Sequence, residues 1–456
     1  MVEVVHCPIK TQFKFFNVTI PIFEQMNYQE TVAYLYDQLP LYSCIGTAAY
    51  KEDITNTVKL CAAIGNPQNK IKTIHVAGTN GKGSTSHMLA AIFQSSGYRT
   101  GLYTSPHLHD FRERIRLNGE LISREFIVSF IDRIRSVSEE IKPSFFELTV
   151  AMALEYFVEE SVDIAIIETG LGGRLDSTNI ILPELSIITN IGYDHMNILG
   201  DTLEQIAFEK AGIIKPNVPV IIGEALDNTL PVFSSRAAQC NAPLLLAEDS
   251  FKILSTKSTT QMLEVTVRDL NTQIKDSYAL DLNGIYQQKN LRTVLTAINV
   301  LRTQGFIIPD SAIEKALRAV KILTGLRGRW DVINENPLIV LDVAHNADGM
   351  EQVLHQIRST TYKNLHIIFG MVKDKAIEKI LKLLPADAIY YFTKANIPRA
   401  LNENELSLLA AQYGLVGRQY PHVNMALLAA KEQADVKDLI LVCGSVFLVG
   451  EVEVSG

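Results

Sequence analysis

Cysteine is scarce in this sequence, and its five cysteines are scattered without a single C-x-x-C pair. This spacing excludes a disulfide framework and a thiolate zinc site, and it favours a cytoplasmic protein with reduced thiols. Long apolar runs are also missing, so no segment predicts a membrane span. The first 25 residues lack the apolar block of a signal peptide. We expect residues 1–25 to be an N-terminal extension, to which we assign no role.

Positive charge is not in excess either. The chain has 42 lysine and arginine residues against 50 aspartate and glutamate residues, which gives a net charge of −8. A nucleic-acid-binding protein normally carries a basic face, so the composition argues against such a partner. Small anionic substrates stay possible, because a local basic pocket can form on an acidic protein. We expect a monomer that acts on small molecules, with no nucleic-acid or membrane partner.

The chain of 456 residues is too long for one ordinary core, which predicts two or three domains. Short apolar runs alternate with helical patterns, as is typical of an α/β chain with mainly parallel sheets. We expect a first domain at 26–323 and a smaller second domain at 337–456, with a junction rich in Gly, Asn and Pro at 324–336. The expected strands are 71–78, 99–105, 162–170, 185–191 and 218–223, an antiparallel pair within 251–270, and then 337–345, 364–371, 388–395 and 438–451.

A glycine-rich loop, "HVAGTNGKGST" at 75–85, lies between an expected strand and an expected helix. Bare backbone N–H groups and a helix N-terminus both favour phosphate, and Lys82 supplies a positive charge. A tight turn would explain one glycine but not three glycines around a lysine. The usual P-loop places Ser or Thr directly after the lysine to reach magnesium, whereas here Gly83 follows and Ser84 comes one position later. The loop therefore predicts phosphate binding, with the metal held from elsewhere.

Several polar residues follow the expected strands of the first domain. Ser105 and Glu168 each come at the end of a strand, and Asp194 and His195 follow another. Ligands bind at the carboxyl ends of strands in α/β sheets, and a carboxylate there is costly to bury unless it meets a metal or a cation. Taken alone, His195 would be a packed histidine and Lys210 a surface residue. Taken together, these residues favour a common site.

The second domain carries "LDVAHNADGM" after its first strand, and Asp342, His345 and Asn346 have the same placement. Polar groups at strand ends in both domains predict a cleft between the domains. The arginines of "FRERIR" are, by themselves, expected on a solvated face.

Seven motifs occur in one order along the chain: "GTNGKGS", "TSPHL", "ETGLGGRLDSTN", "DHMNILG", "EKAGI", "GRW" and "DVAHN". In these motifs the chain resembles the folylpolyglutamate synthase/dihydrofolate synthase enzymes, relatives of the Mur peptide ligases. The resemblance runs from about residue 26 to the end. We therefore expect an N-terminal P-loop-type domain with a mainly parallel sheet and a smaller C-terminal Rossmann-like α/β domain.

The resemblance implies a site for ATP and two magnesium ions. It places the nucleotide on Thr79, Asn80, Gly81, Lys82, Gly83, Ser84, Asn290, Arg329 and Asp342. It places magnesium on Ser105, Glu168 and His195, with Lys210 carbamylated so that an anionic oxygen holds a second ion. Lys82, Lys210 and His345 are the catalytic residues that it implies, with His345 near the reacting phosphate.

The resemblance also implies a pterin site, on Ser144, Phe145, Phe146, Glu147, Leu175, Asp176 and Ser177. In isolation the two phenylalanines would be assigned to the core. The implied reaction adds L-glutamate to dihydropteroate and to reduced folates through an acyl phosphate formed with ATP. Two alternatives stay open at this point: an enzyme restricted to folate polyglutamylation, and a nucleotide-binding switch without ligase activity.

Overall fold

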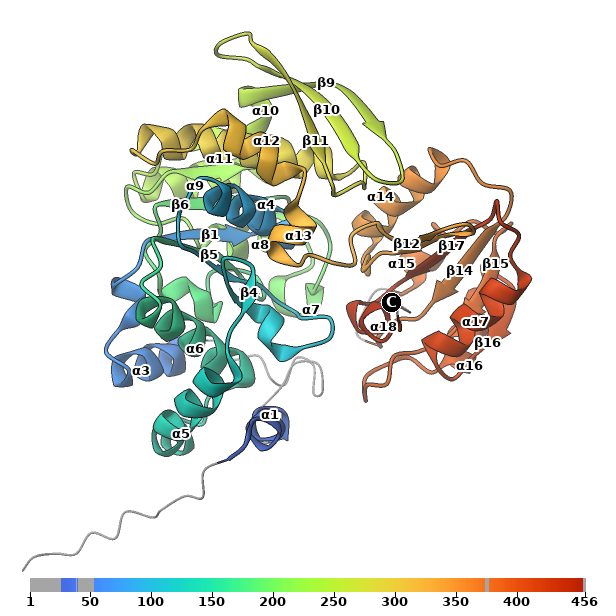
Figure 1. Ribbon diagram of the computed structural model, residues 1–456, viewed down its shortest axis with the longest axis horizontal. Helices are drawn as coiled ribbons and strands as arrows, with labels where there is room; N and C mark the ends of the chain where they lie inside the picture. The colour runs from blue at the N-terminus through green and yellow to red at the C-terminus, as the bar shows by residue number, and fades with distance from the viewer. Residues whose placement is uncertain (1–25, 38, 40–52, 374–376, 454–456) are drawn as a thin grey trace, which may run out of the picture.

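The computed structural model describes residues 26–453 except for 38, 40–52 and 374–376. The expected extension at 1–25 lies outside the described residues. Two α/β domains lie side by side, the N-terminal one in blue to yellow and the C-terminal one in orange to red (Figure 1). The expected fold class is confirmed.

The N-terminal domain is built on an eight-stranded sheet with the order β4-β3-β2-β5-β1-β6-β7-β8. Strands β2, β5, β1, β6, β7 and β8 are parallel, while β3 and β4 add an antiparallel edge. The central strands are buried along their whole length, which explains their continuous apolar runs. The strands are β1 (Thr73–Ala77), β2 (Thr100–Tyr103), β3 (Ile115–Leu117), β4 (Glu120–Leu121), β5 (Ile164–Glu168), β6 (Leu185–Ile188), β7 (Val220–Ile222) and β8 (Leu244–Leu246).

Helices cover both faces of this sheet. One face packs against α4 (Lys82–Ser95) and α11 (Gln287–Thr303), with which Ile74 and Val76 of β1 share an apolar core. The other face packs against two helix groups, so β1 is enclosed on both sides. These groups comprise α1 (Tyr28–Asp37), α3 (Thr55–Ala63), α5 (Arg124–Ile141) and α6 (Phe145–Glu159) in one, and α8 (Leu203–Ala211) and α9 (Leu230–Gln239) in the other, with the short α7 (Met196–Leu199) beside α8.

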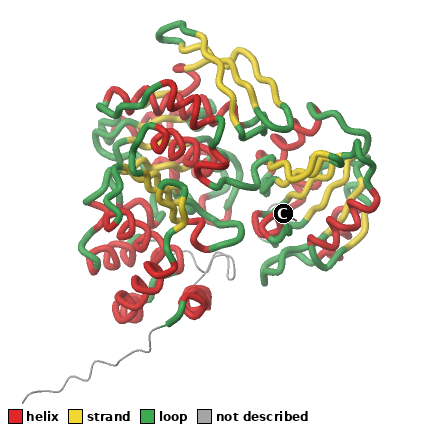
Figure 2. Tube along the Cα trace, viewed as in Figure 1, coloured by secondary structure: helices red, strands yellow, loops and turns green. Residues whose placement is uncertain are grey.

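A separate antiparallel sheet lies above α11 and α12 (Asp310–Leu317) at the top of the view (Figure 2). The pair expected within 251–270 is present as β9 (Phe251–Ser258) and β10 (Leu263–Asp269). A third strand, β11 (Lys275–Leu280), was not predicted, because its first residues are polar and exposed and give no apolar signal. Two short helices, α10 (Ala247–Ser250) and α13 (Val320–Thr324), flank this region.

The C-terminal domain has a six-stranded sheet with the order β12-β13-β17-β14-β15-β16, parallel except for β12. Strand β12 (Asp331–Glu335) pairs with β13 (Leu338–Leu341) inside the stretch expected to be a junction. The stretch expected as one strand at 438–451 is instead β17 (Leu439–Cys443) followed by α18 (Val446–Gly450), because Gly444 turns the chain at φ +107° and Ser445 caps the helix. The other elements are α14 (Ala347–Arg358), β14 (Leu365–Phe369), α15 (Ile377–Leu381), β15 (Ile389–Phe392), α16 (Glu403–Ala411), β16 (Gly417–Gln419) and α17 (Val423–Gln433).

Three cysteines, Cys61, Cys240 and Cys443, are free and buried, whereas Cys7 and Cys44 lie outside the described residues. Among the helices of the described part, none is both long enough and apolar enough to cross a bilayer.

Candidate active site

The glycine loop follows β1 at the point where the sheet brings three strand ends together. Its neighbours in the sheet are β5, which ends at Glu168, and β6, which leads into the 189–195 loop. Two glycines are required by close contacts. A Cβ on Gly78 would lie 1.8 Å from Oγ1 of Thr189, and one on Gly81 would lie 2.3 Å from Oδ1 of Asn290. Gly81 also has a φ of +85° and directly precedes α4, whose N-terminal N–H groups face the loop.

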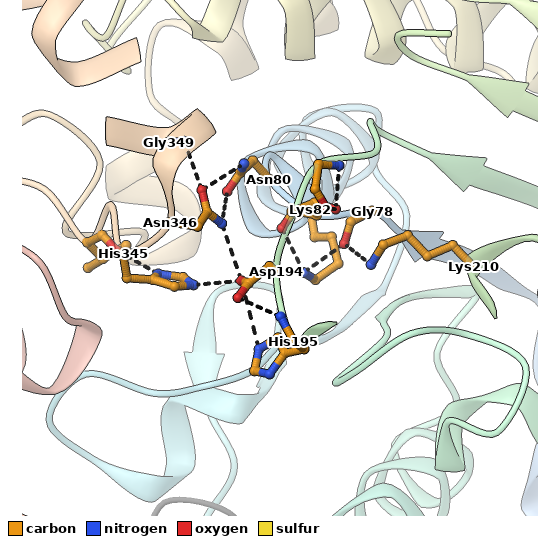
Figure 3. Close-up of polar contacts among 12 residues, drawn as sticks. Gly78, Asn80, Lys82, Asp194, His195, Lys210, His345, Asn346 and Gly349 are labelled. Carbon is orange, nitrogen blue, oxygen red and sulfur yellow. Dashed lines mark hydrogen bonds and ion pairs between the residues drawn. The ribbon is translucent and has the colours of Figure 1, made fainter. Parts of the chain in front are cut away.

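Two lysines converge on one carbonyl oxygen of this loop (Figure 3). Nζ of Lys82 lies 3.1 Å from the carbonyl oxygen of Gly78, and Nζ of Lys210 lies 2.9 Å from the same oxygen. Lys210 is only 4% exposed, so its interpretation as a surface residue is wrong. Burial, reinforced by the charge of Lys82, lowers the pKa of Lys210 to about 7. A neutral amine is therefore available at Lys210 near neutral pH.

Ser105 and Glu168 line one cavity at the boundary between the domains. Gly83 of the loop and Arg329 and Val446 of the C-terminal side complete this part of its wall. Burial raises the pKa of Glu168 to about 7, although Lys82 and Arg329 oppose the shift. A hydroxyl and a carboxylate are hard oxygen donors of the kind that magnesium binds. This pair fits the metal site that the sequence implied.

His195 faces a different set of partners. It precedes α7 with a φ of +51°, and its Nε2 lies 3.8 Å from Oδ2 of Asp194. The same oxygen of Asp194 is 3.2 Å from Nε2 of His345 and 3.2 Å from Nδ2 of Asn346. In the described part of the chain, no three His, Cys, Asp or Glu side chains are grouped as a metal site. His195 is thus placed beside the interdomain contact, and it is not among the residues that line the cavity of Ser105 and Glu168.

The start of the glycine loop contacts the C-terminal domain directly. The side-chain amides of Asn80 and Asn346 exchange two hydrogen bonds of 3.2 and 3.1 Å. Thr79 instead stays within the N-terminal domain, where its hydroxyl donates to the carbonyl oxygen of Gly192 and accepts from the N–H of the same residue. The loop is therefore held from both sides in its present conformation.

The other residues expected at the nucleotide already join the elements around the loop. Nε2 of Gln287 lies 3.0 Å from Oγ of Ser84, and Asn290 donates to Gln287 from the next turn of α11. Asp342 is buried and accepts hydrogen bonds from the Tyr286 hydroxyl and the Trp330 N–H, each 2.8 Å long. These contacts bring α11, the segment before β12 and the end of β13 to one place.

The residues expected at a pterin differ strongly in exposure. Ser144 and Glu147 form a capping box at the start of α6, which occupies both side chains. Phe145 is buried and stacks on Tyr36 with ring centres 5.5 Å apart, so it is a core residue. Phe146 is half-buried, and a Cβ on Gly170 would lie 2.4 Å from its Cζ atom. Of this pair, only Phe146 keeps part of its surface exposed.

The 170–178 turn is organised by Asp176. Its Oδ2 accepts from the N–H of Leu171 at 2.7 Å, and its Oδ1 accepts from the N–H and the hydroxyl of Thr178. Asp176 and Ser177 are buried, whereas Leu175 is half-buried. The carboxylate of Asp176 is mainly engaged by its own loop.

Some features of this region were not expected from the sequence. Arg114, expected on a solvated face, is buried; its Nε donates to Nδ1 of His107 at 2.8 Å and its guanidinium lies over the Phe145 ring. His87 and Arg116 line the same cavity as Ser105. A weak signal existed for Val446, because "CGS" at 443–445 follows a strand as the other motifs do. For Asp194 the sequence indicated a place after a strand, but it gave no indication of the contacts with His345 and Asn346.

The sequence and the fold are similar to those of known proteins. The Mur ligase middle domain matches residues 76–298, and the Mur ligase glutamate ligase domain matches residues 328–446. The dihydrofolate synthase/folylpolyglutamate synthase of Bacillus subtilis is 32% identical over 404 residues, which cover 86% of this chain and 92% of that protein. Two solved structures are also similar. The structure of Escherichia coli FolC in complex with DHPP and ADP matches with a TM-score of 0.80 and 27% identity, and the match covers 93% of this chain and 96% of that chain. The structure of the Yersinia pestis bifunctional folylpolyglutamate synthase/dihydrofolate synthase with AMPPNP and manganese matches with a TM-score of 0.79 and 28% identity, and the match covers 93% of this chain and 97% of that chain.

Proposed function

Because the chain belongs to the dihydrofolate synthase/folylpolyglutamate synthase family of Mur ligases, it is an ATP-dependent ligase, and we propose that it adds L-glutamate both to dihydropteroate and to reduced folates. Family membership removes the nucleotide-binding switch as an alternative. The restricted folylpolyglutamate synthase stays as the competing assignment, and the experiment below separates the two.

One observation carries this proposal: a single cavity has walls from both domains and joins the parts that such a ligase needs. Gly83 belongs to the phosphate loop, Ser105 and Glu168 are oxygen donors, and Arg329 adds positive charge from the other side. A transferred phosphoryl group needs positioning and charge neutralisation rather than a nucleophile from the protein. The cavity supplies these conditions where the domains meet.

For the nucleotide, we propose that the loop N–H groups and Lys82 bind the ATP phosphates. Lys82 hydrogen-bonds to the carbonyl oxygens of Gly78 and Thr79 in its own loop, and a rotation of the side chain would direct its Nζ to a phosphate. Ser105 and Glu168 would hold magnesium, which neutralises charge on the phosphates when it is bound. His195 would require a rotation away from Asp194 to join them.

We propose that Lys210 is carbamylated and holds a second magnesium ion. The uncharged amine adds to carbon dioxide, and the proton lost from nitrogen goes to solvent. A carbamate at this position would carry the negative charge that the pair of converging lysines lacks. Its oxygens are the ligand type that magnesium prefers.

For the acceptor, we propose that the partly exposed phenyl ring of Phe146 stacks on the flat heterocycle of the pterin. Ser144, Phe145 and Glu147 then support this ring from the start of α6, and Asp176, with Leu175 and Ser177 beside it, shapes the adjoining turn. This distribution revises the equal roles that the sequence suggested for Phe145 and Phe146.

In the proposed reaction, a carboxylate of the acceptor attacks the γ-phosphorus of ATP and forms an acyl phosphate and ADP. The amine of L-glutamate then attacks the acyl carbon, forms the amide bond, and releases phosphate and a proton. Lys82 stabilises negative charge in the first step. His345, 3.2 Å from Asp194, is held at the domain boundary where the reacting phosphate would lie. Closure of the domains would exclude the water that hydrolyses acyl phosphates.

We also propose the molecular setting of this activity. The domains would meet at the segment between Gly325 and Trp330, just before β12, and the enzyme would act as a cytoplasmic monomer on small molecules. The buried free thiols support a reducing compartment.

The test is to incubate the pure protein with ATP, magnesium and L-glutamate, adding dihydropteroate or tetrahydrofolate, and to identify products by mass spectrometry. We expect one glutamate on dihydropteroate and one or more on tetrahydrofolate, with ADP released in proportion. Products from tetrahydrofolate alone would establish the restricted enzyme. ATP hydrolysis without any glutamylated product would overturn the proposal.

A further inference from the structure

A histidine lies fully buried in the middle of β1, three residues before the glycine loop begins at Gly78. His75 has no exposed surface, and its Nε2 lies 2.8 Å from Oγ1 of Thr178. Its Nδ1 has no hydrogen-bond partner within the described residues. The side chain therefore has one polar contact, and that contact reaches the 170–178 turn.

The direction of this hydrogen bond follows from the next partner. Oγ1 of Thr178 lies 2.5 Å from Oδ1 of Asp176, which also accepts from the Thr178 N–H at 3.0 Å. Burial raises the pKa of Asp176, but backbone N–H groups donate to both of its oxygens and favour the ionised form. An ionised carboxylate can only accept, so the hydroxyl proton of Thr178 points to Asp176. The hydroxyl oxygen must then accept from Nε2–H of His75. Burial lowers the pKa of His75 to about 3, which keeps the ring neutral in this tautomer.

Asp176 continues the chain of contacts to the surface. Its second oxygen accepts from the N–H of Leu171 at 2.7 Å, which fixes the turn at Gly170 and Leu171. The ring of Phe146 lies directly on Gly170, as the 2.4 Å clash of a Cβ there with its Cζ atom shows. A series of contacts thus connects His75 in β1 to the partly exposed ring of Phe146.

The unpartnered nitrogen of His75 is a cost without a structural benefit. A buried polar atom that makes no hydrogen bond destabilises the fold, and an apolar side chain at this position would avoid the penalty. Sites at which a sequence breaks such a rule are expected to serve function. The other nitrogen, which donates to Thr178, is the one through which His75 acts on its surroundings.

We propose that His75 is a positioning residue for the acceptor: through Thr178 it orients the Asp176 carboxylate and with it the turn beneath Phe146. It touches neither nucleotide nor acceptor. This inference rests on the proposed function, because it assigns the surface at Phe146 to the pteroyl group. It predicts that His75 affects acceptor binding while ATP binding stays unchanged.

The test compares two matched pairs of variants. Thr178→Val removes the hydroxyl and Thr178→Ser keeps it; His75→Leu removes the donor, while His75→Gln carries an amide N–H at the position of Nε2. Thr296→Val deletes another buried hydroxyl, on α11 at the opposite face of the sheet, and serves as the control. Each protein is titrated with dihydropteroate and with tetrahydrofolate, and separately with ATP, by calorimetry, and its unfolding temperature is recorded.

We expect His75→Leu and Thr178→Val to weaken acceptor binding about tenfold and to leave ATP affinity unchanged. His75→Gln, Thr178→Ser and the control should bind acceptor within about threefold of the wild type. The double variant His75→Leu with Thr178→Val should be no weaker than Thr178→Val alone, because one contact passes through the other. The unfolding temperature of His75→Leu should equal or exceed that of the wild type.

Two results would overturn the inference: unchanged acceptor affinity in His75→Leu, or equal losses of acceptor and ATP affinity together with a lower unfolding temperature. If the wild-type protein itself binds no pteroyl acceptor, the proposed function fails instead. The wild-type titration therefore separates the two failures.

Discussion

Asn80 in the glycine loop and Asn346 in the C-terminal domain pair their side-chain amides through two reciprocal hydrogen bonds, 266 positions apart in the sequence. Asn346 also donates to Asp194 and accepts from the N–H of Gly349, which caps α14. One side chain thus links the phosphate loop, the loop after β6 and the first turn of a C-terminal helix (Figure 3). Through this link, the position of the C-terminal domain is coupled to the phosphate loop.

Asn346→Asp tests this coupling. Aspartate keeps the helix cap but loses the N–H donor to Asn80 and places a carboxylate beside Asp194. We expect the turnover number to fall by about tenfold or more, with little change in unfolding temperature. Steady-state kinetics and thermal unfolding would measure both. Asn334→Asp, at an exposed site in β12, is the matched control, and equal kinetics in the two variants would contradict the coupling.

Lys82→Ala should abolish detectable turnover, because it removes the positive charge next to the phosphates. The loop backbone is held by Thr79 and the glycines, so the circular dichroism spectrum should not change. Glutamylation rates checked by mass spectrometry would measure the loss. Lys252→Ala on the exposed face of β9 should behave as the wild type. Near-normal activity of Lys82→Ala would contradict the assignment of this loop to binding of the ATP phosphates.

Lys210 should be carbamylated, and its modification should depend on pH. Its pKa is lowered to about 7, so the reactive neutral amine becomes more abundant as pH rises through 7. Protein depleted of carbon dioxide at pH 6 should lose activity and regain it with bicarbonate, faster at pH 8 than at pH 6.5. Lys210→Ala should be inactive, with partial rescue by short carboxylic acids. Recovery that does not depend on bicarbonate would contradict the carbamate.

His87 provides a pH prediction on stability. Burial, with help from Arg116 and Arg329, lowers its pKa from 6.5 to about 3. Below pH 6.5 the unfolded chain binds a proton that the folded chain does not, so the free energy of unfolding falls as pH falls toward 3. Per pH unit this contributes at most about 1.4 kcal/mol. In denaturant titrations from pH 7 to 4.5, His87→Leu should lose less stability than the wild type; identical slopes would show that His87 takes up its proton in the folded state.

Phe145 and Phe146 form an adjacent pair with opposite expected effects. Phe145→Ala should destabilise the fold by about 3–5 kcal/mol, because it empties a packed position between Tyr36 and Arg114. Phe146→Ala should cost less stability and raise the KM for the acceptor about tenfold, because stacking is lost. Urea unfolding and acceptor kinetics measure the two effects. A higher KM for the acceptor in Phe145→Ala, with an unchanged KM in Phe146→Ala, would place the acceptor elsewhere.

Much of this protein was determined by the sequence itself. Continuous apolar runs predicted the parallel strands, since both faces of a buried sheet require apolar side chains, and the glycine loop after β1 followed from its spacing. Ser105 and Glu168 were expected to lie together because polar residues at the ends of parallel strands gather at one edge of a sheet. Asp342 has the same placement in the sheet of the other domain, and this predicted a cleft between the domains. Local sequence suffices for such features, because each depends on one strand and the turn after it.

The tertiary structure alone decided which side chains face a ligand. Helical periodicity could not separate Phe145 from Phe146, because their exposure depends on Tyr36 and Gly170, which belong to distant segments. The burial of Lys210 and the partners of Asp194 likewise come from packing between elements. Strand β12 forms within an apparent junction because β13 offers it an edge to pair with. These outcomes depend on contacts across the chain, and a pattern within one segment carries no information about them.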